Sequence, residues 1–298
     1  MQVTISLLLQ IKGDNTINTT YVYRKHLRQP VKTFFIMGGI ILAFIILLSI
    51  GLIVADYGPV NTDFLFIFAA AILFITIIVS LELLLIYALL LRRFKYIRVT
   101  LDEEGIVYRN IKEQIFVPYE DIRMIQFPSV KYMGGWTKIV YGNGNIRLTA
   151  VLENLGEFMS ELKQKLDERN MMEVYNEKRF FSFYKTGVFA DESWGRIYGN
   201  VLMQVLTCFF CVVITIVTLY LQGGSEYSSM LMYASYLIPI LGYVISEIIL
   251  GYLVHKRVVE DCYELLPRNE GLEKKIFMIC NFGAAIIYLI ILFASVTM

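Results

Sequence analysis

Histidine, cysteine and charged residues are all scarce in this sequence. Its 298 residues include two histidines and four cysteines, and these are not clustered as the ligands of a zinc site are. HExxH, GxSxG and Walker-type glycine loops are also absent. These absences argue against an enzyme, and we expect no catalytic residue, no cofactor and no metal.

Only 18% of the residues are charged, against about 25% in an average soluble protein. A helix needs about 20 predominantly apolar residues to cross a bilayer. Five runs are long enough: residues 34–55, 64–91, 201–221, 230–254 and 276–296. The sequence therefore predicts an α-helical polytopic membrane protein with hairpins at 34–92 and 198–257 and a fifth helix at 276–297.

Lysine and arginine flank these runs on alternate sides. They precede the first run, follow the second and fourth, and precede the fifth, whereas the loops 56–63 and 222–229 contain none. Positive residues are retained on the cytoplasmic side, and the first residues lack the features of a signal peptide. We predict a multi-pass protein of the cell membrane with a cytoplasmic N-terminus and middle region and an external C-terminus.

The cysteines fit this picture as structural residues. Cys208 and Cys211 form a CFFC sequence in the third run, where we expect small packing groups. Cys262 and Cys280 lie toward the predicted cytoplasmic side, where disulfides are not expected; reversible acylation of either is the alternative.

The middle of the chain has a different pattern. Residues 96–150 alternate β-branched or aromatic residues with polar ones, which predicts antiparallel strands. Turn signals separate them at DEEG (102–105), GG (134–135) and GNGN (142–145), where Asn143-Gly144 suits a tight hairpin.

An amphipathic helix is predicted after these strands. Asn154 and Glu157 resemble a capping box at its start. Five apolar residues share one face of the helix: Leu155, Phe158, Met159, Leu162 and Leu166. We therefore predict an inserted α+β domain at 95–170, an antiparallel sheet or partial barrel with a C-terminal helix.

The run IRVTLDEEGIVYRNIKEQIFVPYEDIRMIQF, followed by hairpins and then NLGEFMSELKQKL, resembles the bacterial pleckstrin-homology (PH-like) domains. In membrane proteins such as the YcxB-like group, this domain directly follows a transmembrane hairpin. The resemblance depends on the turn at 104–106, the strand at 117–122 and the final helix. It implies a binding or scaffolding module without catalytic residues.

One loop departs from the phosphoinositide-binding PH domains, in which the loop joining the first two strands is basic. The loop expected at that place is DEEG, with three carboxylates at Asp102, Glu103 and Glu104, and these should repel a phosphate. We therefore expect this loop not to recognise a lipid headgroup. An unidentified protein partner at the cytoplasmic face, bound by strand addition at a sheet edge, is the better interpretation. Membrane lipids act as solvent, nucleic acid is not an expected partner, and homo-oligomerisation stays open.

Two segments flank the module. Residues 171–197 mix basic and aromatic side chains, which is typical of an interfacial linker; a strip that contacts a protein or RNA is the alternative. Residues 1–33 form a cytoplasmic N-terminal segment, in which the alternation of residues 3–9 favours an additional strand on the sheet.

Glu82 is unusual because it lies among leucines in SLELLLIYALLLRR at 80–93. The pattern recurs at a constant spacing: Glu82, Tyr87 and Arg92 match Glu247, Tyr252 and Arg257. This recurrence suggests two similar hairpins related as a parallel repeat.

A carboxylate at the bilayer centre costs about 2.5–3.5 kcal/mol, and we expect no lysine or arginine at that depth. Both glutamates should then face the bundle with raised pKa values.

Three roles are open for these glutamates. The first is to clamp the hairpins together by hydrogen bonds, the second is to form a proton or cation site, and the third is to face lipid without a partner. The leading interpretation of the whole chain is a non-enzymatic bacterial membrane protein that presents its module as a scaffold or regulator for protein interactions. The alternative is a small transporter or channel component with a site at Glu82 and Glu247, although five helices are few for an alternating-access carrier.

Overall fold

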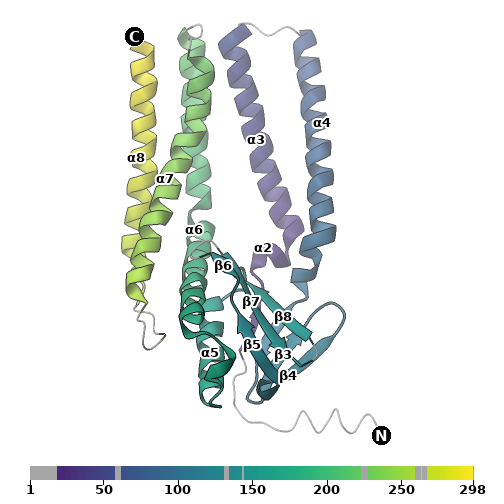
Figure 1. Ribbon diagram of the computed structural model, residues 1–298. Helices are drawn as coiled ribbons and strands as arrows, with labels where there is room; N and C mark the ends of the chain where they lie inside the picture. The colour runs from purple at the N-terminus through teal and green to yellow at the C-terminus, as the bar shows by residue number, and fades with distance from the viewer. Residues whose placement is uncertain are drawn as a thin grey trace.

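The computed structural model describes residues 19–57, 62–130, 134–142, 144–222, 227–258, 263 and 267–297. This part of the chain is mostly helical, with five long apolar helices above a small antiparallel sheet region (Figure 1). Each of the five is long and apolar enough to cross a bilayer, which confirms the five helical runs predicted from the sequence.

The long helices contribute unequally to the packing. They are α3 (Pro30–Tyr57), α4 (Thr62–Ile86), α6 (Glu177–Gln222), α7 (Ser228–Arg257) and α8 (Glu270–Thr297). Helices α6, α7 and α8 form a packed bundle, and α3 lies against α6 and α7. Among the long helices, α4 contacts mainly α3 (Figure 1). A π-helical turn η1 (Tyr87–Leu91) and a 3-10 turn η2 (Arg92–Lys95) lead from α4 into the sheet region.

The first sheet contains strands from both sides of the α3–α4 hairpin. Its order is β1-β2-β3-β4, formed by β1 (Thr20–Val22), β2 (Arg98–Leu101), β3 (Gly105–Arg109) and β4 (Gln114–Pro118). Strand β1 precedes the hairpin and pairs antiparallel with β2, which follows it. The additional N-terminal strand is therefore at 20–22, whereas the strand predicted at 3–9 lies outside the described residues. The short helix α2 (Lys25–Arg28) connects β1 to α3.

The early position of β1 corrects the interpretation of the DEEG loop. Since β1 pairs with β2, DEEG joins the second and third strands of the sheet rather than the first two. The turn is closed by the N–H of Asp102, which donates to the carbonyl of Gly105 at 2.9 Å. Tyr119 further fixes the turn, because its hydroxyl donates to the carbonyl of Asp102 at 3.0 Å.

The second sheet is built on a long hairpin. Its strands are β5 (Ile122–Gln126), β6 (Ser129–Val130), β7 (Gly134–Tyr141) and β8 (Gly144–Thr149), and β7 pairs with each of the other three. The predicted turn residue Asn143 lies outside the described residues. Short 3-10 turns η3 (Tyr119–Asp121) and η4 (Met172–Val174) connect neighbouring elements.

Helix α5 (Leu155–Asp167) covers the core between the sheets. All five apolar residues of its predicted face are buried, which confirms that face. The capping box is wrong, because Asn154 adopts the left-handed conformation (φ 56°, ψ 40°) and its side chain makes no capping hydrogen bond. Asparagine tolerates this conformation better than most residues, so here the backbone rather than the side chain starts the helix.

The predicted linker at 171–197 is largely helical and belongs to the core. Helix α6 begins at Glu177 and continues without a break to Gln222, so the expected boundary at 198 falls inside one helix. Phe180 and Phe183 are fully buried in the same core as α5 and the sheets. Their i, i+3 spacing places both on one helical face, and this face packs on the module instead of lying free at an interface.

Candidate functional site

Glu82 has no polar partner in the part of the chain that the structure describes. It lies on α4 with an exposed side chain, and no hydrogen bond or ion pair reaches it from any described residue. The candidate span Phe66–Leu89 has no buried residue in its most hydropathic stretch. Of the three roles considered for Glu82, this position fits the third, in which the side chain faces outward from α4 rather than into the bundle.

Glu247 has a different environment, because it meets an arginine. The guanidinium of Arg196 donates from Nε to Glu247 Oε1 at 2.9 Å and from Nη2 to Glu247 Oε2 at 2.8 Å. The hydroxyl of Ser193 donates to the same Oε2 at 3.0 Å. Arg196 is only 4% exposed. A paired arrangement of two hydrogen bonds between guanidinium and carboxylate is the strongest geometry for this type of ion pair.

This ion pair is the centre of a balanced cluster that joins α6, α7 and α8. Arg196 also lies 3.4 Å from Glu273 on α8 and 3.7 Å from Glu192, one turn earlier on α6. The cluster contains three arginines and three glutamates: Arg196, Arg257, Arg268, Glu192, Glu247 and Glu273. Each charge in the cluster has an opposite neighbour, and this attraction offsets part of the cost of removing the charges from water.

Two expectations about the glutamates are therefore wrong. The structure does not bring Glu82 and Glu247 together: they lie on α4 and α7, and α3 stands between these helices (Figure 1). A cation does lie at the depth of Glu247. Arg196 was missed because it fell in the supposed linker at 171–197. The signal that was available is the i, i+4 pair of Glu192 and Arg196, which suits a helix that continues through this segment.

The proposed repeat also places matched residues in unlike surroundings. Arg257 is paired with Glu192, whereas Arg92 is exposed. Tyr252 is 60% exposed, and Tyr87 is half-buried within the π-helical turn. The hairpin of α6 and α7 is closely packed, and that of α3 and α4 is not. The recurring residues therefore do not form equivalent sites.

A cavity of about 570 Å³ lies in the module, beside the η2 turn that leads in from α4. It is bordered by η2, by the turn between β3 and β4, and by the outward-facing residues of β7 and β8. Three cationic side chains line it, from Arg93, Lys112 and Arg147. Four aromatic rings contribute to the same walls: Tyr23, Phe94, Tyr108 and Trp136. Burial raises the pKa of Tyr108, so its hydroxyl remains protonated at neutral pH.

The cysteines and histidines form no metal site in the described residues, where no three His, Cys, Asp or Glu side chains come together in a way that could hold an ion. Cys208 and Cys211 are buried free thiols, and Cys280 is partly buried; Cys262 lies outside the described residues. His26 is stacked on Trp194 at 4.3 Å and lies 2.5 Å from the hydroxyl of Tyr198. These contacts hold the N-terminal segment against α6.

Comparison with known proteins returned no match: no family model, no curated protein and no solved structure is similar to this chain. The described part of the chain defines the class of molecule: five apolar helices, each long enough to cross a bilayer, with a small antiparallel sheet region.

Proposed function

We propose that the chain is a non-enzymatic integral membrane protein that holds a cytoplasmic PH-like module beneath the membrane as a platform for a protein partner. The order of elements supports this proposal. Four strands form one sheet, the following strands form a second, and one amphipathic helix covers the core between them, which is the order that the resemblance to PH-like domains implies.

The observation that carries the proposal is the rigid attachment of the module to the bundle. Helix α6 contributes residues to the core of the module at its first turns and to the apolar bundle at its last turns. Gly156 on α5 lies so close to α6 that a Cβ atom there would approach Val188 Cγ2 to 2.8 Å. A module fixed in this way presents its surfaces in a constant orientation, which is what an assembly platform requires.

Asp191 reinforces this attachment from the side of α6. Its carboxylate accepts the N–H of Gly156 at 3.0 Å and forms a buried ion pair with Arg24. The segment before α3, the module helix α5 and the bundle helix α6 are thus joined at one point. A force on the module would be transmitted directly to the helices.

The free edge of β4 is the surface best suited to a protein partner. Among the described residues, β4 pairs only with β3. Asn110 and Glu113 close the turn by a hydrogen bond, so alternation along the antiparallel pair leaves the N–H groups of Gln114 and Phe116 directed away from β3. The ring of Phe116 is 48% exposed beside this edge. An extended peptide could add here as a further strand.

A pair of substitutions at Phe116 tests the proposal. Phe116→Ala removes the ring, and Phe116→Pro removes both the ring and the outward N–H without breaking a bond to β3. Proteins that co-purify with the unaltered chain in gentle detergent should be retained by the alanine variant to a greater extent than by the proline variant. Equal retention by both variants would reject edge recognition, and the absence of any specific partner would reject the platform itself.

A transport function has less support from the geometry. The carboxylate of Glu247 is already occupied by Arg196 and Ser193, and Glu82 lies on a different helix that α3 separates from the bundle. No shared proton or cation site between these glutamates is therefore proposed.

A further inference from the structure

The cavity bordered by η2, β3, the turn between β3 and β4, and strands β7 and β8 has an uneven charge distribution. Arg93, Lys112 and Arg147 line it, and no lining residue among those described is acidic. None of these three cations forms an ion pair with a carboxylate in the described part of the chain. Glu113 follows Lys112 in the same turn but does not line the cavity. Three uncompensated cations around one concave space repel one another, and an anion placed between them relieves that repulsion.

The cavity also offers hydrogen bonds and an apolar wall. Tyr23 is 1% exposed, and its hydroxyl accepts the N–H of Thr149 at 3.2 Å, which leaves the hydroxyl proton available to an acceptor in the cavity. Arg93 lies over the ring of Phe94 at 5.3 Å, so its guanidinium is supported by an aromatic face. A phosphate bears several acceptor oxygens and suits guanidinium groups in this setting.

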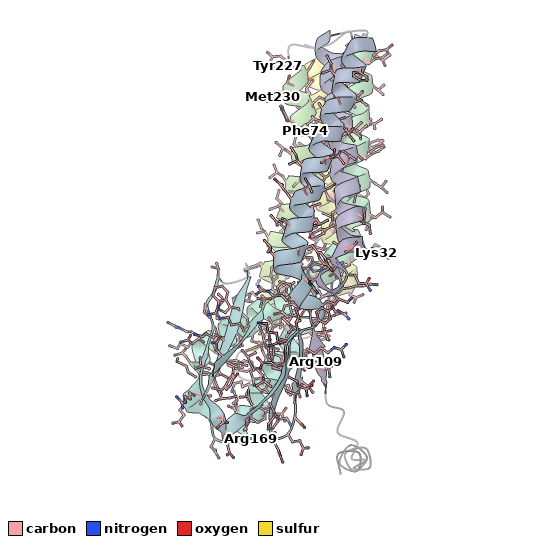
Figure 2. The ribbon with its side chains drawn as sticks, turned by 90° about the vertical axis from the view of Figure 1, so that its right-hand side faces the viewer. Lys32, Phe74, Arg109, Arg169, Tyr227 and Met230 are labelled. Carbon is pink, nitrogen blue, oxygen red and sulfur yellow. The ribbon has the colours of Figure 1, made fainter. Side chains whose placement is uncertain are left out.

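The position of the cavity points to a source of phosphate. Arg93 follows the candidate span Phe66–Leu89 by four residues, a distance of about 6 Å along a helix. The headgroup layer extends about 5–8 Å beyond the hydrocarbon core. Arg109, at the cavity end of β3, lies nearer to the helices than Arg169, which bonds the DEEG turn at the opposite end of the module (Figure 2). The acidic turn is therefore remote from the cavity and does not oppose an anion there.

We infer that this cavity binds the phosphate group of an anionic amphiphile or small phosphorylated molecule, with Arg93, Lys112 and Arg147 as its charge partners and Tyr23 as a hydrogen-bond donor. The inference rests on the proposed function only in placing the cavity against a membrane surface. It does not depend on a protein partner at β4, because the two surfaces involve different residues.

Trp136 provides an internal reporter, because it lines the cavity and the chain has two tryptophans. In the full-length Trp194→Phe protein in neutral detergent, the fluorescence of Trp136 is followed during three separate titrations. The probes are inorganic phosphate, short-chain phosphatidylglycerol and short-chain phosphatidylcholine. Calorimetric titration of the unaltered protein with the same three probes checks that the Trp194 substitution has not changed the cavity.

Saturable binding of phosphatidylglycerol, with weak or no binding of phosphatidylcholine, supports a lipid source; saturation by inorganic phosphate supports a soluble one. Arg147→Gln should weaken binding of the effective probe by about tenfold or more. Arg179→Gln is the matched control, since Arg179 is also exposed and lies at the start of α6, away from the cavity. The inference would be overturned if the two lipids bound equally and Arg147→Gln left that binding unchanged. It would also be overturned if none of the probes bound.

Discussion

Arg196 on α6 and Glu247 on α7 form a paired contact of two hydrogen bonds, at 2.9 and 2.8 Å, inside the three-helix bundle. The contact lies where α6 passes from the module into the bundle, so one side-chain pair connects the attachment of the module to the packing of the helices. A buried ion pair contributes less to stability than its Coulomb attraction suggests, because both charges lose solvation. Removal of one partner is nevertheless costly, because the other charge is left buried and unpaired.

The first prediction compares the two glutamates that the sequence suggested were equivalent. Glu247→Gln leaves Arg196 with only its weaker contacts to Glu192 and Glu273, and should lower the free energy of unfolding by about 3 kcal/mol. Glu82→Gln is the control, and because Glu82 is exposed and has no polar partner among the described residues, its effect should stay within about 0.5 kcal/mol. Denaturant unfolding in detergent micelles measures both. Equal effects of the two substitutions would contradict the burial of Glu247 against Arg196.

The contrast between these residues indicates what sequence alone can reveal. Hydrophobic run length predicted all five helices, since a span needs a minimum number of apolar residues whatever its neighbours are. Alternation predicted the sheet region, and the buried face of α5 followed from helical spacing. The partners of Glu247 were not predicted, because they depend on where α6 begins, and the interfacial composition of residues 171–197 outweighed the i, i+4 pair of Glu192 and Arg196.

The insertion of the α3–α4 hairpin between two paired strands could not be predicted from the sequence. Strand β1 spans only Thr20–Val22, which is too short for a periodic signal. Its pairing with β2 is a contact between residues about 80 positions apart, such as Thr20 and Thr100. The cavity was missed for the same reason, because its three cations come from three separate segments that only the tertiary fold brings together.

A second prediction concerns the close approach of α7 and α8 at Gly242. A Cβ atom on Gly242 would lie 2.6 Å from Ala284 Cβ and 2.7 Å from the carbonyl oxygen of Cys280. Backbone atoms cannot yield as a flexible side chain can, so Gly242→Ala should separate the helices and cost about 1–3 kcal/mol. A lower midpoint of thermal unfolding in detergent is the expected reading.

Gly283 supplies the control for this substitution. It lies on α8, and a Cβ atom there would meet nothing within 4 Å. Gly283→Ala should therefore leave the protein as stable or make it up to about 1 kcal/mol more stable, because alanine favours helix more than glycine does. If Gly242→Ala is tolerated as well as Gly283→Ala, then α7 and α8 are not packed as closely as this.

A third prediction concerns the two ion pairs that attach the N-terminal segment. The Arg24–Asp191 pair is mostly buried, with side chains 6% and 23% exposed, whereas Arg28–Glu153 is exposed at 39% and 43%. Double-mutant cycles with glutamine or asparagine at each position should give a coupling of about 1.5–3 kcal/mol for the buried pair. The exposed pair should give about 0.2–1 kcal/mol, since solvent screens it. Similar couplings would mean that Arg24 and Asp191 are not buried together.

The last prediction is a loss of stability in mild acid that originates at His26. Burial, followed by the neighbouring charge of Arg24, lowers the pKa of this imidazole below its ordinary value of 6.5.

Above pH 6.5 the histidine is neutral in both folded and unfolded chains. As the pH falls below 6.5, the unfolded chain takes up a proton that the folded chain does not, so stability decreases until the lower folded pKa is reached. Among the described residues, the groups in contact with the ring or acting on its charge are Arg24, Trp194 and Tyr198, and none of these is a carboxylate. His26→Gln should therefore reduce the pH dependence of stability in this window. Unfolding midpoints measured from pH 7 downward decide the matter, and an unchanged slope in His26→Gln would show that other groups are responsible.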